Sequence, residues 1–202
     1  MAPMKFGIAV AFLTVLAGTV SADSVDDAIA KLVKDRNTPG IAYTVLKNGK
    51  PIKTKCLGFA DLEHRVPVKP ETVFQSGSVG KQFTATLIMQ LVQDGKLALD
   101  DSIRKWLPEG PAEWNAVTIR HMLGHLSGLR TLPYGTMDMR KDYSESDLAE
   151  LMAKISPANK PGEKWAYNNG AYVLLGIIAN RATGKFYGDL LQEKLFGPLK
   201  ME

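Results

Sequence analysis

A hydroxyl and an amine lie three residues apart in the segment Ser78-Val79-Gly80-Lys81. Residues three apart are neighbours on a helix, so both side chains would share one face. A serine becomes a nucleophile when a nearby base takes its proton, and a lysine can be that base if burial or another cation lowers its pKa. The spacing therefore predicts nucleophilic catalysis, with a plain helix cap and a solvated lysine as the alternative.

A second Ser-x-x-Lys sequence, from Ser102 to Lys105, shows that the motif has little specificity by itself. The surroundings of the two copies differ. Ser102 follows two aspartates and begins a short charged helix, which indicates a cap and a surface lysine. Ser78 lies beside Phe74 and Gly77 and begins a long apolar helix, and this helix is expected to be central and buried.

The chain has one Tyr-x-Asn sequence, from Tyr167 to Asn169, in a turn-rich segment that leads into a helix. A phenol beside cationic groups can be held as phenolate and act as a general base, and an asparagine amide can hydrogen-bond a substrate amide. Taken alone, Tyr167 would more often be a packed aromatic residue with a hydrogen-bonded hydroxyl.

Three segments resemble the serine β-lactamase-related family, in its class C β-lactamase, DD-peptidase and esterase branch. They are residues 73–85 with 91–101, residues 121–129 with a His-x-Ser-Gly-Leu pattern, and residues 165–176. Asn168 stands where serine is commoner in that family. Three ordered segments are far more specific than any one of them.

The resemblance implies roles for four residues. Ser78 would be the acylated nucleophile, Lys81 and Tyr167 the proton-transfer pair, and Asn169 a hydrogen-bond partner of the substrate and the lysine. It also implies an α/β fold of the α+β type, in which helices and a helical region flank an antiparallel sheet. Members of the branch continue into further strands and a third motif, of the Lys-Thr-Gly or His-x-Gly kind. The sequence has no Lys-Thr-Gly, so we expect residues 23–202 to be one hydrolase domain that is incomplete at its C-terminus.

Hydrophobic periodicity predicts the elements that must position these residues. An amphipathic helix is expected over residues 25–36, followed by a hairpin of residues 41–46 and 52–59 that turns at Asn48-Gly49. Helices are then expected from Ser78 to Gly95 and over residues 101–107, 118–124, 144–155, 170–182 and 187–195. One hairpin makes a marginal sheet, so the sheet would need further strands.

The N-terminus has the layout of a secretory signal peptide, with Lys5 before an apolar run over residues 8–17. We expect residues 1–22 to be removed, which predicts a periplasmic or extracellular protein with no stable membrane anchor. The net charge of +4 is scattered along the chain, which argues against a nucleic-acid partner.

No cofactor or metal is predicted. The single cysteine, Cys56, cannot form an intramolecular disulfide and is expected to be buried filler. His121 and His125 have the spacing of a zinc pair, but the sequence shows no third ligand, so a structural role is favoured.

These observations favour an exported serine hydrolase that acts through a Ser78 acyl-enzyme on a small-molecule or peptide-like substrate: an amide, a β-lactam or an ester. The competing interpretation is a non-catalytic fragment or ligand-binding module that keeps the cleft residues.

Overall fold

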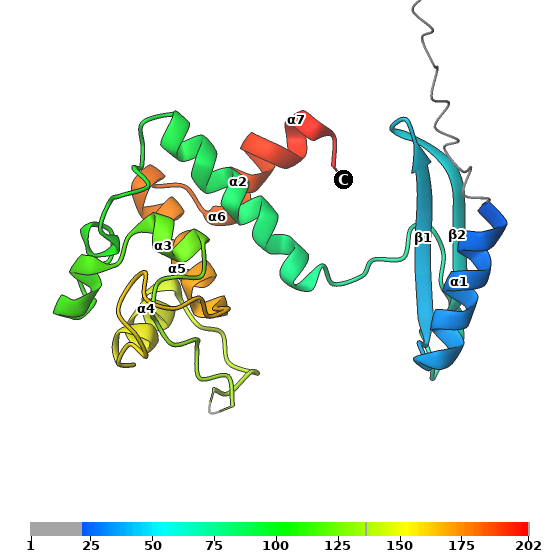
Figure 1. The fold of residues 1–202 in the computed structure, drawn as a ribbon, viewed down its shortest axis with the longest axis horizontal. Coiled ribbons are helices and arrows are strands. Elements are labelled where there is room, and N and C mark those ends of the chain that lie inside the picture. Colours follow the sequence, from blue (N-terminus) through cyan, green and yellow to red (C-terminus); the bar gives the residue numbers. More distant parts are fainter. Residues whose placement is uncertain (1–21, 136, 202) are drawn as a thin grey trace, which may run out of the picture. The chain divides into compact units, whose positions relative to one another are not determined.

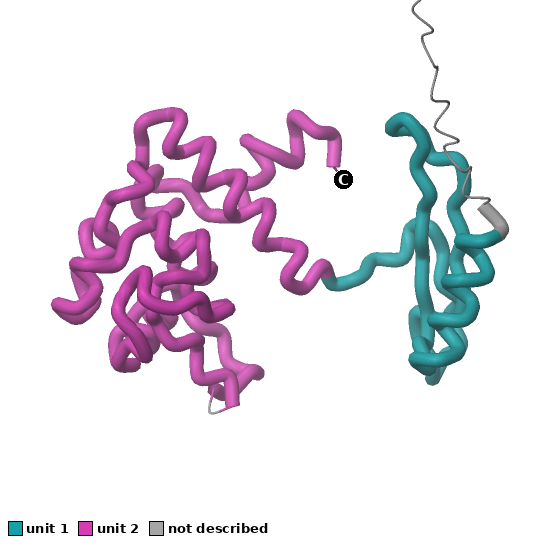
Figure 2. The backbone as a smooth tube through the Cα atoms, in the orientation of Figure 1, with its two compact units in different colours: residues 1–75 teal, residues 76–202 magenta. Residues whose placement is uncertain are grey.

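The computed structural model describes residues 22–135 and 137–201. The chain divides into two compact units, one up to Gln75 and one from Ser76 onward (Figure 2). Each unit is described by itself. The predicted signal peptide lies outside the described residues, apart from Ala22. No helix in the described part of the chain is long and apolar enough to cross a membrane.

The N-terminal unit is a helix packed along an antiparallel sheet (Figure 1). It consists of α1 (Ala22–Asp35), β1 (Gly40–Lys47), β2 (Lys50–Asp61) and β3 (Val66–Pro67), in the sheet order β1-β2-β3. The predicted hairpin is confirmed. Asn48 and Gly49 both have positive φ, 50° and 73°, which suits the tight turn that joins β1 to β2.

A half-buried carboxylate on α1 joins this helix to the hairpin. Asp26 accepts hydrogen bonds from the Tyr43 hydroxyl at 2.6 Å, from Lys53 Nζ at 2.5 Å, and from Lys55. The two lysines and the tyrosine lower the pKa of this carboxyl well below its usual range. Asp26 therefore joins the predicted amphipathic helix to its sheet through polar contacts.

The third strand was not predicted. Residues 66–67 pair with Phe59 and Asp61, and Val68, just after the strand, is buried. Close backbone approach at the start of this sheet depends on Gly58, where a Cβ atom would lie 2.1 Å from the Pro39 carbonyl oxygen. A two-residue strand containing proline has no alternation of polar and apolar residues, so periodicity could not reveal it.

The C-terminal unit is helical (Figure 1). A 3₁₀ turn, η1, leads directly into the long helix α2, and a second long helix, α5, packs against it. Its elements are η1 (Gly77–Val79), α2 (Gly80–Gln93), η2 (Ile103–Lys105), η3 (Ala112–Ala116), α3 (Ile119–Leu123), α4 (Glu145–Ala153), α5 (Asn169–Thr183), α6 (Tyr187–Leu191), the π-helical turn η4 (Gln192–Phe196) and α7 (Gly197–Leu199).

The core of this unit lies where α2 meets α5. Leu87 and Ile88 of α2 are fully buried, as are Leu174 and Ile178 of α5. Burying an aliphatic side chain of this size contributes about 1.5–3 kcal/mol. The predicted central, apolar helix after Ser78 is confirmed, and its packing holds the start of α2 beside the start of α5.

Two predicted helices differ in extent. The expected helix over residues 101–107 is only the 3₁₀ turn η2, because Ser102 caps it and Pro108 follows closely. The expected helix over residues 187–195 is α-helical to Leu191 and then continues as the π turn η4. Apolar spacing does not distinguish one helical hydrogen-bond pattern from another over a single turn.

Candidate active site

Ser78 lies in η1, the turn that enters α2. Its hydroxyl oxygen accepts a hydrogen bond from Lys81 Nζ at 3.2 Å and another from the Tyr167 hydroxyl at 2.6 Å. The N-cap positions of η1 and α2 are Ser76 and Val79. Ser78 occupies neither and is therefore not a plain helix cap, and the predicted proximity of the two motifs is present in the structure.

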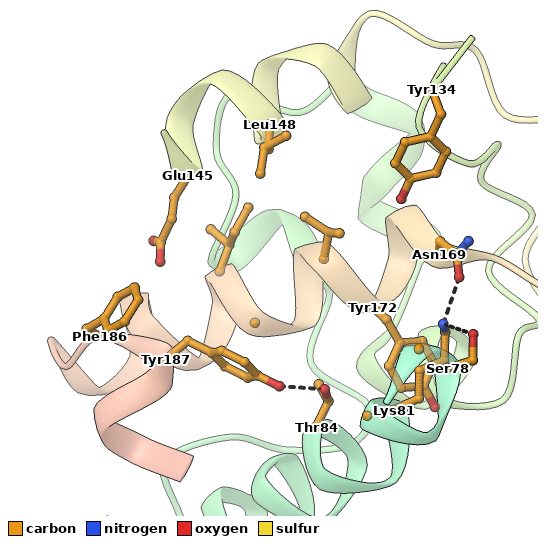
Figure 3. Close-up of a pocket in the computed structure, with 15 residues that line it drawn as sticks. Ser78, Lys81, Thr84, Tyr134, Glu145, Leu148, Asn169, Tyr172, Phe186 and Tyr187 are labelled. Carbon is orange, nitrogen blue, oxygen red and sulfur yellow. Dashed lines mark hydrogen bonds between the residues drawn. The ribbon is translucent and has the colours of Figure 1, made fainter. Parts of the chain in front are cut away.

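Lys81 links Ser78 to the second helix. Its ammonium donates to Ser78 and, at 2.7 Å, to the side-chain oxygen of Asn169 (Figure 3). The structure thus brings together all four residues singled out in the sequence: Ser78, Lys81, Tyr167 and Asn169.

The residue before Asn169 fixes where α5 begins. Asn168 is 2% exposed, and its side-chain oxygen accepts from the backbone N–H of Ala171 as a helix cap. Its side-chain nitrogen donates to the Leu129 carbonyl at 2.5 Å. That carbonyl follows Gly128, where φ is +71° and a Cβ atom would lie 2.2 Å from the Asn159 carbonyl oxygen.

The pKa values of the two tyrosines beside Lys81 are shifted in opposite directions. The interaction with Lys81, followed by the hydrogen bond with Ser78, lowers the pKa of Tyr167. Burial, followed by the nearby Tyr167, raises the pKa of Tyr172. When the environments of two titratable groups separate their pKa values, the group with the lowered value is the better candidate base. Tyr167 has that character, and its hydroxyl contacts Ser78.

A cluster of aromatic rings adjoins the site. Two of its members, His125 and Tyr172, were not predicted as site residues from the sequence. Lys81 Nζ lies 4.8 Å from the Tyr167 ring centroid and 5.5 Å from that of Tyr172. The His125 ring lies 4.7 Å from Tyr167 and 5.1 Å from Tyr172. Tyr172 is three residues after Asn169 on α5, and that spacing could have signalled a shared face.

The two histidines that share zinc-pair spacing have separate roles. His121 belongs to the capping box of α3, where its Nδ1 accepts from the Thr118 N–H at 3.2 Å. Nδ1 of His125 accepts from the Asn168 N–H at 3.1 Å. Among residues 22–135 and 137–201, no group of three or more His, Cys, Asp or Glu side chains is arranged to hold a metal ion.

A cavity of about 560 Å³ adjoins Ser78 and Lys81 and extends between α2, α4 and α5 (Figure 3). Its inner wall includes a hydrogen bond of 2.6 Å between the hydroxyls of Thr84 and Tyr187. Its apolar lining comprises Leu148, Val173, Ile177 and Phe186. Ser78 therefore lies at the edge of a space that suits the apolar part of a small molecule.

The family model for beta-lactamases matches residues 25–202. This chain belongs to the beta-lactamase family. The resemblance seen in the sequence is thereby confirmed, and so is the fold, because solved family members superpose on most of the chain.

Three members of the beta-lactamase family illustrate the similarity. The chain is 33% identical over 180 residues to "Beta-lactamase" of Escherichia coli K12, covering 89% of this chain and 46% of that protein. The octameric penicillin-binding protein homologue of Pyrococcus abyssi is 31% identical, with a TM-score of 0.78 over 90% of this chain and 44% of its own. The D-amino acid amidase of Ochrobactrum anthropi SV3 is 30% identical, with a TM-score of 0.76 over 88% and 50%. This chain spans about half the length of these relatives.

Proposed function

We propose that this beta-lactamase family member is an exported serine hydrolase that forms an acyl-enzyme on Ser78. One observation carries the proposal: the Ser78 hydroxyl contacts both a lysine ammonium, at 3.2 Å, and a tyrosine hydroxyl, at 2.6 Å. Each contact is within the reach needed for proton transfer. Serine hydrolases of this kind act on an acyl carbon, so the substrate would be an amide, a β-lactam or an ester.

The first half of the reaction forms the acyl-enzyme. Tyr167, as phenolate, takes the proton from the Ser78 hydroxyl while the serine oxygen bonds to the carbonyl carbon of the substrate. The tetrahedral intermediate then collapses, the bond from carbon to the leaving nitrogen or oxygen breaks, and Tyr167 returns its proton to the leaving group. Lys81 favours the phenolate because its positive charge lies beside the ring.

The second half releases the product. A water molecule attacks the ester carbon and gives its proton to Tyr167, and collapse of the second intermediate returns that proton to the Ser78 oxygen. Asn169 holds Lys81 through its side-chain oxygen, which leaves its side-chain NH₂ group able to donate to an acyl oxygen. The chain thus offers a nucleophile, a base, a cation and an amide donor in one site.

The substrate range is supported by the cavity and by the relatives. The surface that lines the cavity beside Ser78 is mainly apolar, which fits an acyl group with an apolar substituent. One relative is named a beta-lactamase and another a D-amino acid amidase, and these names indicate β-lactam and amide substrates for those two proteins.

Export rests on the pattern of residues 1–22, a lysine followed by an apolar run and small residues. The N-terminal sequence of the protein recovered from the medium or periplasm tests it. We expect a mature N-terminus near Asp23. Recovery of the chain in the cytoplasm, with Met1 retained, would contradict this part of the proposal.

Intact mass spectrometry after exposure to a serine-directed fluorophosphonate tests the chemistry. We expect one adduct per chain, located on Ser78 by peptide mapping and absent in Ser78→Ala. Ser76→Ala is the matched control, because this serine lies two residues earlier and makes no side-chain cap; it should be labelled like the unaltered protein. A folded protein without an adduct would overturn the proposal and favour the ligand-binding alternative.

A further inference from the structure

His125 occupies the space behind the reactive tyrosine. Its ring centroid lies 4.7 Å from that of Tyr167, 5.1 Å from that of Tyr172 and 6.0 Å from that of Trp165. The planes of the histidine and the two tyrosines are tilted by 40° and 37°. The imidazole therefore contacts both of the phenol rings that lie near Lys81.

Two hydrogen bonds fix His125 to the segment that carries Tyr167. Its carbonyl oxygen accepts from the Ala166 N–H at 2.9 Å, and its Nδ1 accepts from the Asn168 N–H at 3.1 Å. These two amides lie on either side of Tyr167 in the chain. The backbone of the tyrosine is thus held from both sides by one residue.

The backbone of His125 is itself in an uncommon conformation. Its φ is +58°, in the left-handed region that non-glycine residues other than Asn, Asp and His seldom adopt. Such a conformation persists where surrounding contacts require it. Here it directs the carbonyl and the ring of one residue toward the same neighbouring segment.

We propose that His125 is the positioning residue of this site: a neutral imidazole whose ring and Nδ1 hold the Tyr167 hydroxyl against Ser78. The inference builds on the proposed acyl-enzyme chemistry, because the residue that it positions is the proposed base. His125 makes no hydrogen bond to Ser78 or Lys81 among the described residues, so it acts through Tyr167.

The proposal requires a particular tautomer. An imidazole that accepts at Nδ1 carries its proton on Nε2. Protonation of Nδ1 would place a donor against the Asn168 N–H and a second positive charge near Lys81. Burial and Lys81 lower the pKa of His125, which keeps the ring neutral at neutral pH. The titratable groups that face it are Lys81 from α2, Tyr167, and Tyr172 from α5.

Substitution of His125 by Asn removes the ring while retaining a residue that tolerates positive φ. We expect His125→Asn to slow fluorophosphonate labelling of Ser78 about a hundredfold, the loss typical of a small misplacement of a reacting group. The midpoint of the Tyr167 phenol titration should also move upward, toward the ordinary value near 10. The absorbance difference between each protein and its Tyr167→Phe counterpart isolates that phenol.

His121→Asn is the matched control. His121 also accepts a backbone N–H at Nδ1 and lies four residues earlier in the same segment. The ring contacts with Tyr167 and Tyr172 are made by His125. A merely structural histidine would affect stability in both variants and the Tyr167 titration in neither. We expect the titration to move only in His125→Asn. A folded His125→Asn with an unchanged labelling rate and titration would overturn the proposal.

A measurement on the unaltered ring covers the case in which His125→Asn does not fold. The chain has three histidines, so nitrogen NMR of the protein, His64→Asn and His121→Asn assigns each imidazole. We expect His125 at pH 8 to carry its proton on Nε2. A proton on Nδ1 would overturn the inference. Neither this measurement nor the phenol titration depends on covalent labelling. If the protein forms no adduct, the proposed function is refuted, and these two measurements still test the role of His125.

Discussion

Residues 78–81 and residues 102–105 contain the same Ser-x-x-Lys spacing, and each begins a helical turn of the same unit. The hydroxyl of Ser78 contacts the side chains of Lys81 and Tyr167. The hydroxyl of Ser102 instead contacts backbone groups: it accepts from the Arg104 N–H and donates to the Trp114 carbonyl. The same Ser-x-x-Lys spacing therefore has different roles at the two places, and the residues that surround each copy decide which role it has.

The lysines diverge in the same way. Lys81 reaches across to Asn169 on α5, whereas Lys105 turns back to the Asp101 carboxylate at 3.0 Å and is largely exposed. The partners of the first copy are Asn169 on α5 and Tyr167, which lies two residues before that helix. The comparison teaches that a catalytic arrangement depends on what faces the motif, and four predictions test this.

The largest expected effect is at Ser78, the proposed nucleophile. Ser78→Ala should abolish covalent labelling, because the oxygen that forms the acyl or phosphonyl bond is gone. Ser102→Ala should be labelled at a rate within twofold of the unaltered protein. Time courses of adduct formation by mass spectrometry give both rates. Labelling that depends equally on Ser102 would abolish the distinction between the two copies.

The next effect concerns the lysines. Lys81→Met should slow labelling of Ser78 by about 10²–10⁴-fold, the usual contribution of a positioned proton-transfer group. Lys105→Met should leave the rate unchanged, because an exposed ion pair contributes only about 0–1 kcal/mol to stability and none to the site. Equal slowing in the two variants would show that Lys81 acts through general stability.

The pH dependence sharpens the role of the first copy. Tyr167 accepts a proton only as phenolate, so labelling should rise with pH through its titration, at a midpoint below the ordinary phenol value of about 10. Since Lys81 is the main cause of the lowered pKa, Lys81→Met should move that midpoint upward. A midpoint that falls or stays fixed in this variant would contradict the assignment.

The smallest expected effect is on the free energy of unfolding of the protein, through Ser102 in the second copy. Ser102 is the N-cap of η2, and removal of such a cap typically costs about 0.5–2 kcal/mol. Ser102→Ala should therefore lower the free energy of unfolding by about 1 kcal/mol in urea titrations. A variant that is as stable as the unaltered protein would mean that Ser102 has neither role.

Local signals were sufficient for much of the fold. Asn48-Gly49 gave the hairpin because both residues accept positive φ, and the apolar spacing after Ser78 gave α2. The strand at Val66–Pro67 was missed because its two residues carry no periodic pattern. Its pairing with β2 depends on long-range contacts that no local window contains.

The same limit applies to the site. The motif residues Ser78, Lys81, Tyr167 and Asn169 were predicted from their types and spacing and from the resemblance, and the structure places them together. His125 lay in a segment that was recognised, yet its ring was assigned only a structural role. Its place against Tyr167 follows from a backbone conformation and a hydrogen bond to Asn168, neither of which has a sequence signature.

The site is assembled across a long stretch of chain. The hydrogen bond from Lys81 to Asn169 joins residues 88 apart, and that from Tyr167 to Ser78 joins residues 89 apart. Ser78 and Lys81 belong to η1 and α2, whereas Tyr167 precedes α5 and Asn169 begins it, so the proposed chemistry requires that the two helices be docked. Labelling of Ser78 is consequently a reporter of tertiary assembly. Two polypeptides divided in the exposed segment near Arg140 would each be inert, and recovery of labelling on mixing would count their productive encounters.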